Sequence, residues 1–192
     1  MKVNGKNLTT IWYNEKEDCV NIIDQTLLPH QLEIKSLKTL EDTVVAIKNM
    51  MVRGAPLIGV TAAYGMYLAS KKDTTDEYFF NVANLLKKAR PTAVNLAWAV
   101  DKIISTIKNI ENNKRSELIL SLANKIREDD IITCSKIGDN GLLLLEEIYN
   151  KKQSRVNILT HCNAGWLATV DWGTALSPIF KANRKNIPIH IW

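Results

Sequence analysis

Apolar residues in most of the first 150 positions recur at the three- and four-residue spacing of helices. Before that pattern begins, Trp12–Tyr13 and Val20–Ile23 flank an acidic stretch and predict a small β-hairpin. The segment Asp24–Pro29 follows as an ordered turn. The N-terminal part of the chain is therefore predicted to be mainly helical, with a small hairpin at its start.

Capping residues and prolines mark the helix boundaries in this region. Thr39–Asp42 has the spacing of a capping box, and a new helix is expected to begin at Pro56 and again at Pro91. Small residues in the second of these helices would let a neighbouring helix approach closely. Two further helices are predicted at 117–129 and 139–149.

A polar stretch at 150–155 separates this region from a different pattern, in which the order is strand, helix, strand. The predicted elements are strands at 156–159 and 187–192 and a helix at 173–182. We therefore predict an α/β protein with a mainly helical domain over 1–150 and the first βαβ unit of a Rossmann-like parallel-sheet domain over 151–192. Because two parallel strands cannot cover their own faces, this second domain is expected to be truncated or completed by a partner.

Composition narrows the class of protein. Of the 192 residues, 46% are hydrophobic, which is ample for a core. The net charge of +5 is spread over separated lysine pairs without interleaved aromatics, which argues against nucleic-acid binding. No apolar segment approaches the roughly 18 residues that span a bilayer. Three cysteines without framework spacing indicate reduced thiols and no metal site. We expect a cytoplasmic protein that binds neither membrane nor nucleic acid.

The turn after the first predicted strand of the second domain carries the strongest candidate for chemistry. Ligands in open α/β sheets bind beyond the carboxyl ends of the strands, which is where Thr160–Asn163 lies. Backbone amides and His161 beside Cys162 would favour its thiolate form. A buried, unreactive Cys162 is the alternative, and His161 is either a base or a hydrogen-bonded structural residue. Asp171 is expected to cap the following helix rather than act as an acid.

Two arginines stand at predicted helix starts. The amides of Gly54 and Ala55 precede a helix whose N-terminus favours an anion, and Arg53 adds a cation suited to phosphate. Arg90 precedes a proline, so we expect it to be extended at the mouth of the next helix, within reach of the same anion. The alternatives are a surface residue in a helix–helix turn for Arg53 and a basic residue that ends the preceding helix for Arg90.

Four separated motifs resemble the S-methyl-5-thioribose-1-phosphate isomerase family of methionine salvage. They are Asp24–Pro29, Val52–Gly59, Arg90–Leu96, and Leu159–Gly165 together with Gly173–Leu176. Their order and spacing match from about residue 10 to the last residue. The resemblance implies conversion of an aldose 1-phosphate into its ketose 1-phosphate, with a small sugar phosphate as substrate and no cofactor or metal. It also implies a homodimer when the chain is complete.

By the same resemblance, Arg53, Gly54, Ala55 and Arg90 would bind the substrate, chiefly its phosphate, and Cys162 would be the catalytic cysteine. The family's catalytic Asp and further substrate-binding residues have no counterparts in these 192 residues. The resemblance therefore implies that the chain is about the first half of the family enzyme. We expect this part alone to be inactive.

Three other functions are compatible with parts of the sequence. A ribose-1,5-bisphosphate isomerase fits the motifs at Arg90 and Cys162 less well. A non-catalytic, sugar-phosphate-binding or regulatory subunit, like those of the eukaryotic initiation factor exchange complex, would not need both Arg53 and Cys162. A cysteine-dependent amidohydrolase needs a base and an acid around Cys162, and nothing beyond His161 offers them.

Overall fold

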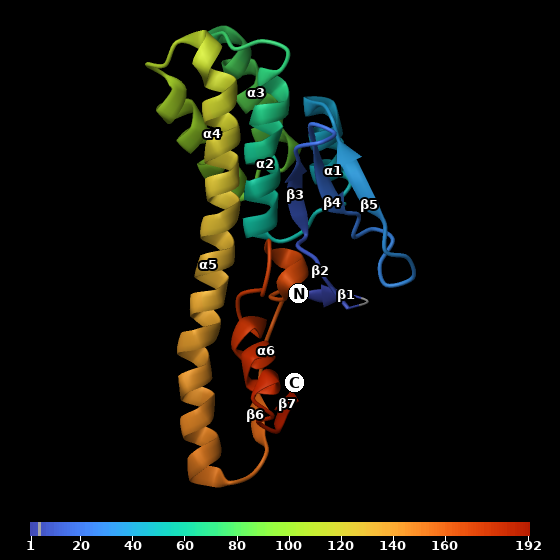
Figure 1. Ribbon diagram of the computed structural model, residues 1–192, viewed down its shortest axis with the longest axis vertical. Helices are drawn as coiled ribbons and strands as arrows, with labels where there is room; N and C mark the ends of the chain where they lie inside the picture. Colours follow the sequence, from blue (N-terminus) through green and yellow to red (C-terminus); the bar gives the residue numbers. More distant parts are fainter. Residues whose placement is uncertain (4) are drawn as a thin grey trace.

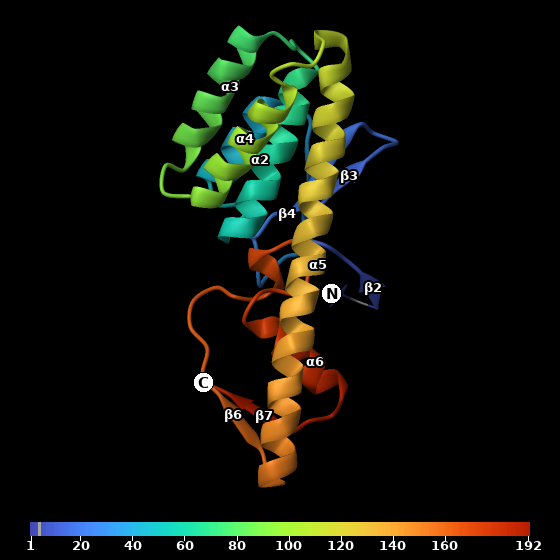
Figure 2. The ribbon, with the colours of Figure 1, turned by 90° about the vertical axis from the view of Figure 1, so that its left-hand side faces the viewer.

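One long helix runs through most of the molecule (Figure 1), whose computed structural model describes residues 1–3 and 5–192. This helix, α5 (Asn112–Lys152), has 41 residues and at 1.5 Å per residue is roughly 60 Å long. Its first half packs against α2 (Ala55–Ser70) and its second half against α6 (Leu176–Arg184), as both views show (Figures 1 and 2). The two packed regions are therefore arranged along a single rod.

The sheet of the N-terminal region has three antiparallel strands. They are β3 (Ile11–Asn14), β4 (Cys19–Ile23) and β5 (Ile34–Leu37), in the order β3–β4–β5. The register places Ile11 opposite Ile22 and Val20 opposite Leu37. The first two strands confirm the predicted hairpin. The third strand, β5, lies in a segment that was predicted to be helical. Three of its four residues are exposed, so β5 is stabilised by its pairing with β4 and not by the burial of apolar side chains.

A second short ladder lies at the chain start, where β1 (Lys2–Val3) pairs with β2 (Lys6–Asn7). Each of these strands has only two residues, which is too short for a hydrophobic periodicity to predict them.

Four helices of the described residues precede α5. They are α1 (Leu40–Lys48), α2, α3 (Asp76–Ala89) and α4 (Val94–Ile107). Two of them, α2 and α4, pack against the first half of α5. The predicted capping box of α1 is confirmed, because Thr39 Oγ1 accepts from the Asp42 amide and the Asp42 carboxylate accepts from the Thr39 amide. Helix α3 is missing from the predicted set. α4 begins three residues after Pro91, because a turn closed by the Ala93 amide on the Arg90 carbonyl (3.0 Å) comes first.

Helix α2 is the centre of the core, and nearly all of its residues are buried. A methyl group at Gly59 would lie 2.9 Å from the Asn95 carbonyl oxygen of α4, and one at Gly65 would lie 2.7 Å from Thr43 Cγ2 of α1. These contacts confirm the predicted role of small residues, because larger side chains would push the neighbouring helices away.

Helix α5 replaces the two helices predicted at 117–129 and 139–149. Glycine weakens an isolated helix, but Gly138 and Gly141 lie inside α5 because α6 packs directly upon them. An added Cβ would meet Ser177 Oγ at 2.3 Å in the first case and Pro178 Cγ at 2.4 Å in the second. Although α5 is long, no helix in the described part of the chain is both long and apolar enough to cross a membrane.

The C-terminal region has the predicted order of strand, helix and strand. β6 (Val156–Ile158) pairs in parallel with β7 (Ile189–Ile191), and α6 lies between them in the sequence. A short 3-10 helix, η1 (Trp166–Ala168), comes before α6, which starts at Leu176 rather than at Gly173. This region packs on the last turns of α5 through its own apolar cluster. The domain boundary at 150/151 and a Rossmann-like character remain predictions.

A charged contact joins the hairpin to α2. Asp18, in the β3–β4 turn, accepts hydrogen bonds from the hydroxyls of Tyr13 (2.8 Å) and Tyr67 (2.7 Å), and Lys71 Nζ lies 2.8 Å from the same carboxylate oxygen. Lys71, followed by the two hydroxyls, lowers the pKa of Asp18 from 3.8 to about 2, against the opposing effect of burial. The ionised carboxylate is therefore the form that stabilises this contact.

The substitution Asp18→Asn is expected to lower the free energy of unfolding at pH 7 by about 1 kcal/mol, a small loss because the Asp18 side chain is 57% exposed. A group with a lowered folded pKa contributes its stability above the unfolded pKa and loses it as pH falls. The difference between parent and variant should therefore shrink between pH 4 and pH 2. Urea unfolding at several pH values measures it. Asp101→Asn, which removes an exposed pair with Lys87, is the control, and an equal effect there would contradict the assignment.

Candidate functional site

The candidate residues lie on three segments that approach one another on one side of the molecule. They come from the start of α2, from the turn between α3 and α4, and from the loop between β6 and η1. In Figure 2 this loop rises from β6 toward the start of α2, on the side that also carries the α3–α4 turn. The sequence separates these segments widely, and the fold brings them to one face.

Gly54 joins the start of α2 directly to η1. It is the N-cap residue of α2, with a φ of 83° that favours glycine. A Cβ on Gly54 would lie 2.3 Å from the Ala168 carbonyl oxygen. The positive φ expected for a helix–helix turn is therefore present, and the same residue also allows the segment after Cys162 to touch the backbone of α2.

Arg53 and Ala55 flank this contact, and both are exposed. No side chain of the described residues caps the first turn of α2, which also contains no acidic residue. Arg53 uses one N–H to reach the Met50 carbonyl at 3.4 Å, and no other hydrogen bond or ion pair of its guanidinium occurs within residues 1–3 and 5–192. Uncapped amides and a nearby cation are the features that attract an anion to a helix start.

Arg90 ends α3 rather than beginning α4. Its backbone is extended, as predicted, with φ −152° and ψ 85°, and its side chain is half-buried. This position agrees with the alternative interpretation, in which a basic residue ends the preceding helix. Within the described residues, no hydrogen bond links Arg90 to Arg53 or to Cys162.

Cys162 is exposed and has a φ of 71°. A positive φ is uncommon for a residue other than glycine and occurs often at functional turns. The exposure contradicts the alternative of a buried cysteine. His161 is exposed as well and forms no hydrogen bond with the described residues, so the interpretation as a hydrogen-bonded structural histidine is wrong.

The other two thiols differ from Cys162. Cys19 is fully buried in β4 and Cys134 is 2% exposed in α5. Burial, with the charge of Asp130 next in order, raises the pKa of Cys134 to about 12, so this group stays protonated at neutral pH. Cys162 is therefore the thiol that a reagent or substrate can reach.

The segment after the loop is anchored by three polar groups that sequence reasoning did not select, of which Thr10 and Gln25 are buried. Gln25 Nε2 donates to the Leu167 carbonyl (2.7 Å), Thr10 Oγ1 donates to the Thr169 carbonyl (2.6 Å), and Asp130 accepts from the Val170 amide (2.7 Å). Burial raises the pKa of Asp130 against the effect of that amide. Only Gln25 stands in a segment that the sequence singled out, the Asp24–Pro29 turn.

Asp171 does not cap α6, contrary to prediction, because α6 begins five residues later. Its carboxylate instead accepts from the amide of Trp172 at 2.8 Å and from the Met1 ammonium at 2.6 Å. The loop end itself is held by the Thr174 amide, which donates to the Ala164 carbonyl at 3.0 Å.

A cavity of about 320 Å³ lies between α2, α4 and α5, beside the start of α2. Pro56 and Gly59 of α2 line it, together with Asn95 and Trp98 of α4 and Thr174 from the C-terminal region. Asn95 and Trp98 thus lie in the first turn and at the start of the second turn of α4. Asp129 and Asp130 of α5 also line the cavity, which offers room for part of a small ligand held at the helix start.

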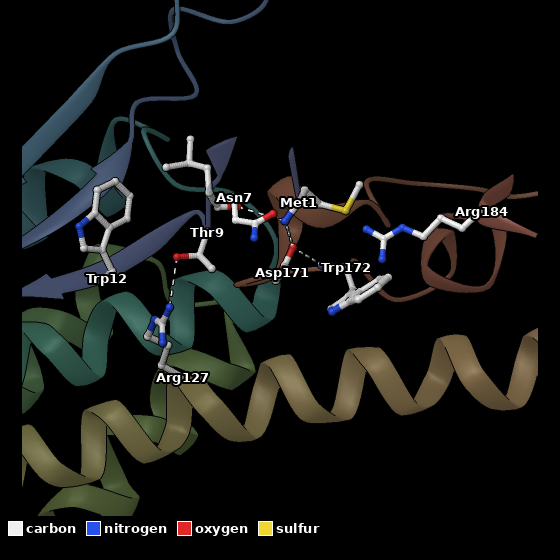
Figure 3. A pocket seen from close by; sticks show the side chains of 9 residues that line it. Met1, Asn7, Thr9, Trp12, Arg127, Asp171, Trp172 and Arg184 are labelled. Atoms are coloured by element: carbon white, nitrogen blue, oxygen red, sulfur yellow. Dashed lines mark hydrogen bonds and ion pairs between the residues drawn. The ribbon is translucent and has the colours of Figure 1, made fainter. Parts of the chain in front are cut away.

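A larger cavity, of about 700 Å³, lies elsewhere; Asp171 lines it, but none of Arg53, Gly54, Ala55, Arg90 and Cys162 does (Figure 3). The Arg127 guanidinium on its wall already donates to the Ile11 carbonyl (2.9 Å) and to Thr9 Oγ1 (3.2 Å). The Arg184 guanidinium lies over the Trp172 ring, 4.5 Å from its centroid. Its cations are therefore engaged with protein groups, and volume alone does not make this cavity the site.

No group of three or more His, Cys, Asp or Glu side chains in the described ranges is placed to hold a metal ion.

Residues 51–192 match the model of the initiation factor 2 subunit family. The chain belongs to this family. A methylthioribose-1-phosphate isomerase of Escherichia coli is 49% identical over 194 residues, which cover all of this chain and 52% of that protein. The crystal structure of 5-methylthioribose 1-phosphate isomerase from Pyrococcus horikoshii has a TM-score of 0.83 at 35% identity, over 97% of this chain and 52% of that one.

A second solved member of the family carries a different name. The crystal structure of translation initiation factor eIF-2B, subunit delta, from A. fulgidus has a TM-score of 0.79 at 34% identity, over 96% of this chain and 54% of that one. These matches confirm the α/β fold with small sheets and the resemblance to methylthioribose-1-phosphate isomerase. The chain spans about half the length of the curated relatives it matches.

The substitution Gly54→Ala is expected to lower the free energy of unfolding by about 2 to 5 kcal/mol, because it adds both backbone strain and a clash with Ala168. Gly5→Ala is the matched control: Gly5 also has a positive φ, of 78°, but an added Cβ would have nothing within 4 Å. The control should lose only about 1 kcal/mol. Urea unfolding compares the two, and equal losses would refute the backbone contact.

Proposed function

We propose that this chain forms the N-terminal part of a methylthioribose-1-phosphate isomerase, the enzyme that converts 5-methylthioribose 1-phosphate to 5-methylthioribulose 1-phosphate in methionine salvage. The observation that carries the proposal is the contact of Gly54 with Ala168, which brings an uncapped helix start with an arginine to the segment following an exposed cysteine. Identity of 46 to 49% to relatives of that name along the whole chain supports it.

In this proposal the start of α2 holds the phosphate. Gly54 and Ala55 contribute backbone amides, Arg53 contributes a guanidinium, and Arg90 reaches across from the end of α3. The cavity beside Pro56 then receives the remainder of the sugar. Binding the phosphate at one fixed end orients the carbon atoms that react.

The chemistry follows from the substrate. Phosphate on the anomeric oxygen locks the sugar as a ring, so ring opening must precede or accompany the movement of hydrogen from C2 to C1. An acid must protonate the ring oxygen, and a second group must manage the C2 proton or stabilise the intermediate. We assign the second role to Cys162, in surroundings dry enough to suppress loss of phosphate.

The acid that protonates the ring oxygen is not assigned to a residue of this chain, although Asp129 and Asp130 line the cavity beside Pro56. Within residues 1–3 and 5–192, no acidic side chain forms a hydrogen bond or ion pair with His161 or Cys162. We therefore propose that residues 1–192 alone do not isomerise the sugar phosphate, since loss of a general acid typically costs about a hundredfold to ten-thousandfold in rate. A group supplied from outside this set would complete the site.

The wider setting is part of the same proposal. The parallel β6–β7 pair with α6 between its strands supports a Rossmann-like C-terminal domain of which this region is the first unit. Three free thiols support a reducing, cytoplasmic compartment. We further propose a homodimer, by resemblance to the isomerase family.

A non-catalytic subunit is the second candidate function, because the A. fulgidus structure with a similar fold is named as a translation initiation factor subunit. The two candidates make opposite demands on Cys162. An enzyme needs its thiol, whereas a regulatory subunit needs only a surface. Turnover of the complete protein with methylthioribose 1-phosphate separates them.

For the anion site, we expect Arg53→Ala and Arg90→Ala each to weaken sugar 1-phosphate binding by about 1.5 to 3 kcal/mol, the usual range for hydrogen bonds to charged groups. Titration calorimetry on the complete enzyme measures this change. Arg155→Ala, which changes an exposed arginine after α5, is the control and should bind as the parent does. Unchanged affinity in both test variants would exclude phosphate binding at this place.

For the thiol, Cys162→Ser is expected to reduce turnover of the complete enzyme nearly to background while the melting temperature changes little. Serine has nearly the same shape but is far less acidic. Cys19→Ser alters a buried thiol and should leave turnover per folded molecule largely intact. A steady-state assay with a parallel thermal melt tests both, and a similar loss of turnover in the two variants would contradict a specific chemical role for Cys162.

A further inference from the structure

We infer that Gln25 is a positioning residue, which holds the turn carrying Arg53 and the segment following Cys162 in one fixed relation. The inference rests on the proposed function, because the two segments matter together only if one binds the phosphate and the other reacts. The sequence singles out the Asp24–Pro29 turn around Gln25, and the proposed chemistry leaves that turn without a role.

Gln25 contacts both segments at once. Its backbone amide donates to the Met51 carbonyl at 2.9 Å, two residues before Arg53. Its side-chain Nε2 donates to the Leu167 carbonyl at 2.7 Å, five residues after Cys162. The residue is only 6% exposed, so water competes little for either hydrogen bond.

The turn around Gln25 is itself held in shape. Asp24 Oδ1 accepts hydrogen bonds from the amide of Thr26 at 3.0 Å and from its hydroxyl at 2.6 Å. These contacts fix the backbone on either side of Gln25, so the direction of its side chain is set before it reaches Leu167. A positioning residue must itself be held rigidly by its surroundings.

Other anchors of the same segment do not reach the Arg53 turn. Thr10 holds the Thr169 carbonyl from the start of β3, and Asp130 holds the Val170 amide from α5. Gly54 touches Ala168 by packing alone. Within the part of the chain that the structure describes, the path from Met51 through Gln25 to Leu167 is therefore the hydrogen-bonded link between the two halves of the site.

The test compares Gln25→Met with Tyr64→Phe in the complete enzyme. Methionine keeps the length of the side chain but cannot donate to Leu167. Tyr64→Phe is the matched control, since it removes another partly buried hydrogen bond, from Tyr64 to Asn124 Oδ1 at 2.7 Å, away from the site. Gln25→Glu is a second variant of nearly the same shape, whose carboxylate likewise cannot donate, and it serves if the methionine variant does not fold.

Two measurements are made, the steady-state constants and amide hydrogen exchange by mass spectrometry. We expect the Gln25 variants to lose about tenfold to a hundredfold in kcat, with KM changed by less than about threefold, because the phosphate stays bound while the reacting groups are misplaced. Exchange should speed up at residues 50–54 and 166–170. Tyr64→Phe should change neither the constants nor the exchange at these two segments.

Three results would overturn the inference. Unchanged exchange in the Gln25 variants would show that the link does not hold the segments. Faster exchange with an unchanged kcat would show a link without a positioning role. A loss of kcat in Tyr64→Phe as large as in Gln25→Met would show that general destabilisation, and not the position of Gln25, causes the loss. A parent that does not isomerise the sugar phosphate refutes the proposed function instead, while the exchange comparison still decides whether Gln25 joins the segments.

Discussion

The architecture depends on the continuity of α5. In a folded protein, most of the stability of a helix comes from what packs upon it rather than from its intrinsic propensity. The N-terminal core covers its first half and α6 covers its second half. Each region therefore stabilises the platform that the other uses, and the glycines beneath α6 allow the close approach that makes this possible.

The N-terminal and C-terminal regions are joined first through α5, and the candidate site lies where they come into contact again. After β6 the chain returns from the far end of α5 to the base of α2, where η1 packs on Gly54. The site is therefore built by long-range closure rather than by one motif. Hydrogen bonds with the side chains of Gln25, Thr10 and Asp130 hold this return, and each of them uses a backbone group of the returning segment.

Local patterns predicted the local parts of this structure. The hairpin and the capping box at Thr39 depend on residues close together in sequence, and β6 and β7 each follow from a short apolar run. The edge strand β5 was missed because three of its four residues are exposed and give no apolar alternation, and the unbroken course of α5 was missed because it depends on packing against α6. α3 was missed although its signal is local: Thr75 caps it, and Phe79 and Leu86 lie on its buried face.

The candidate site divides in the same way. The residue types at Arg53, Gly54 and Cys162 indicate an anion and a reactive thiol without any knowledge of the fold. The contact that unites them does not follow from such patterns. Gln25 and Leu167 are separated by 142 positions, and no periodicity or spacing rule relates residues so far apart.

The continuity of α5 also limits how this chain can change its length. Each residue added to an α-helix turns everything beyond it by about 100° and moves it by about 1.5 Å. An insertion between the α2-binding and α6-binding halves would therefore rotate α6 away from the face that receives η1. Seven added residues would nearly restore the angle, but they would carry α6 about 10 Å along the axis and draw η1 away from Gly54. The C-terminal region contacts the N-terminal region both through α5 and through the segment that returns to Gly54. We therefore expect relatives to vary in length at surface turns and to keep the middle of α5 the same length.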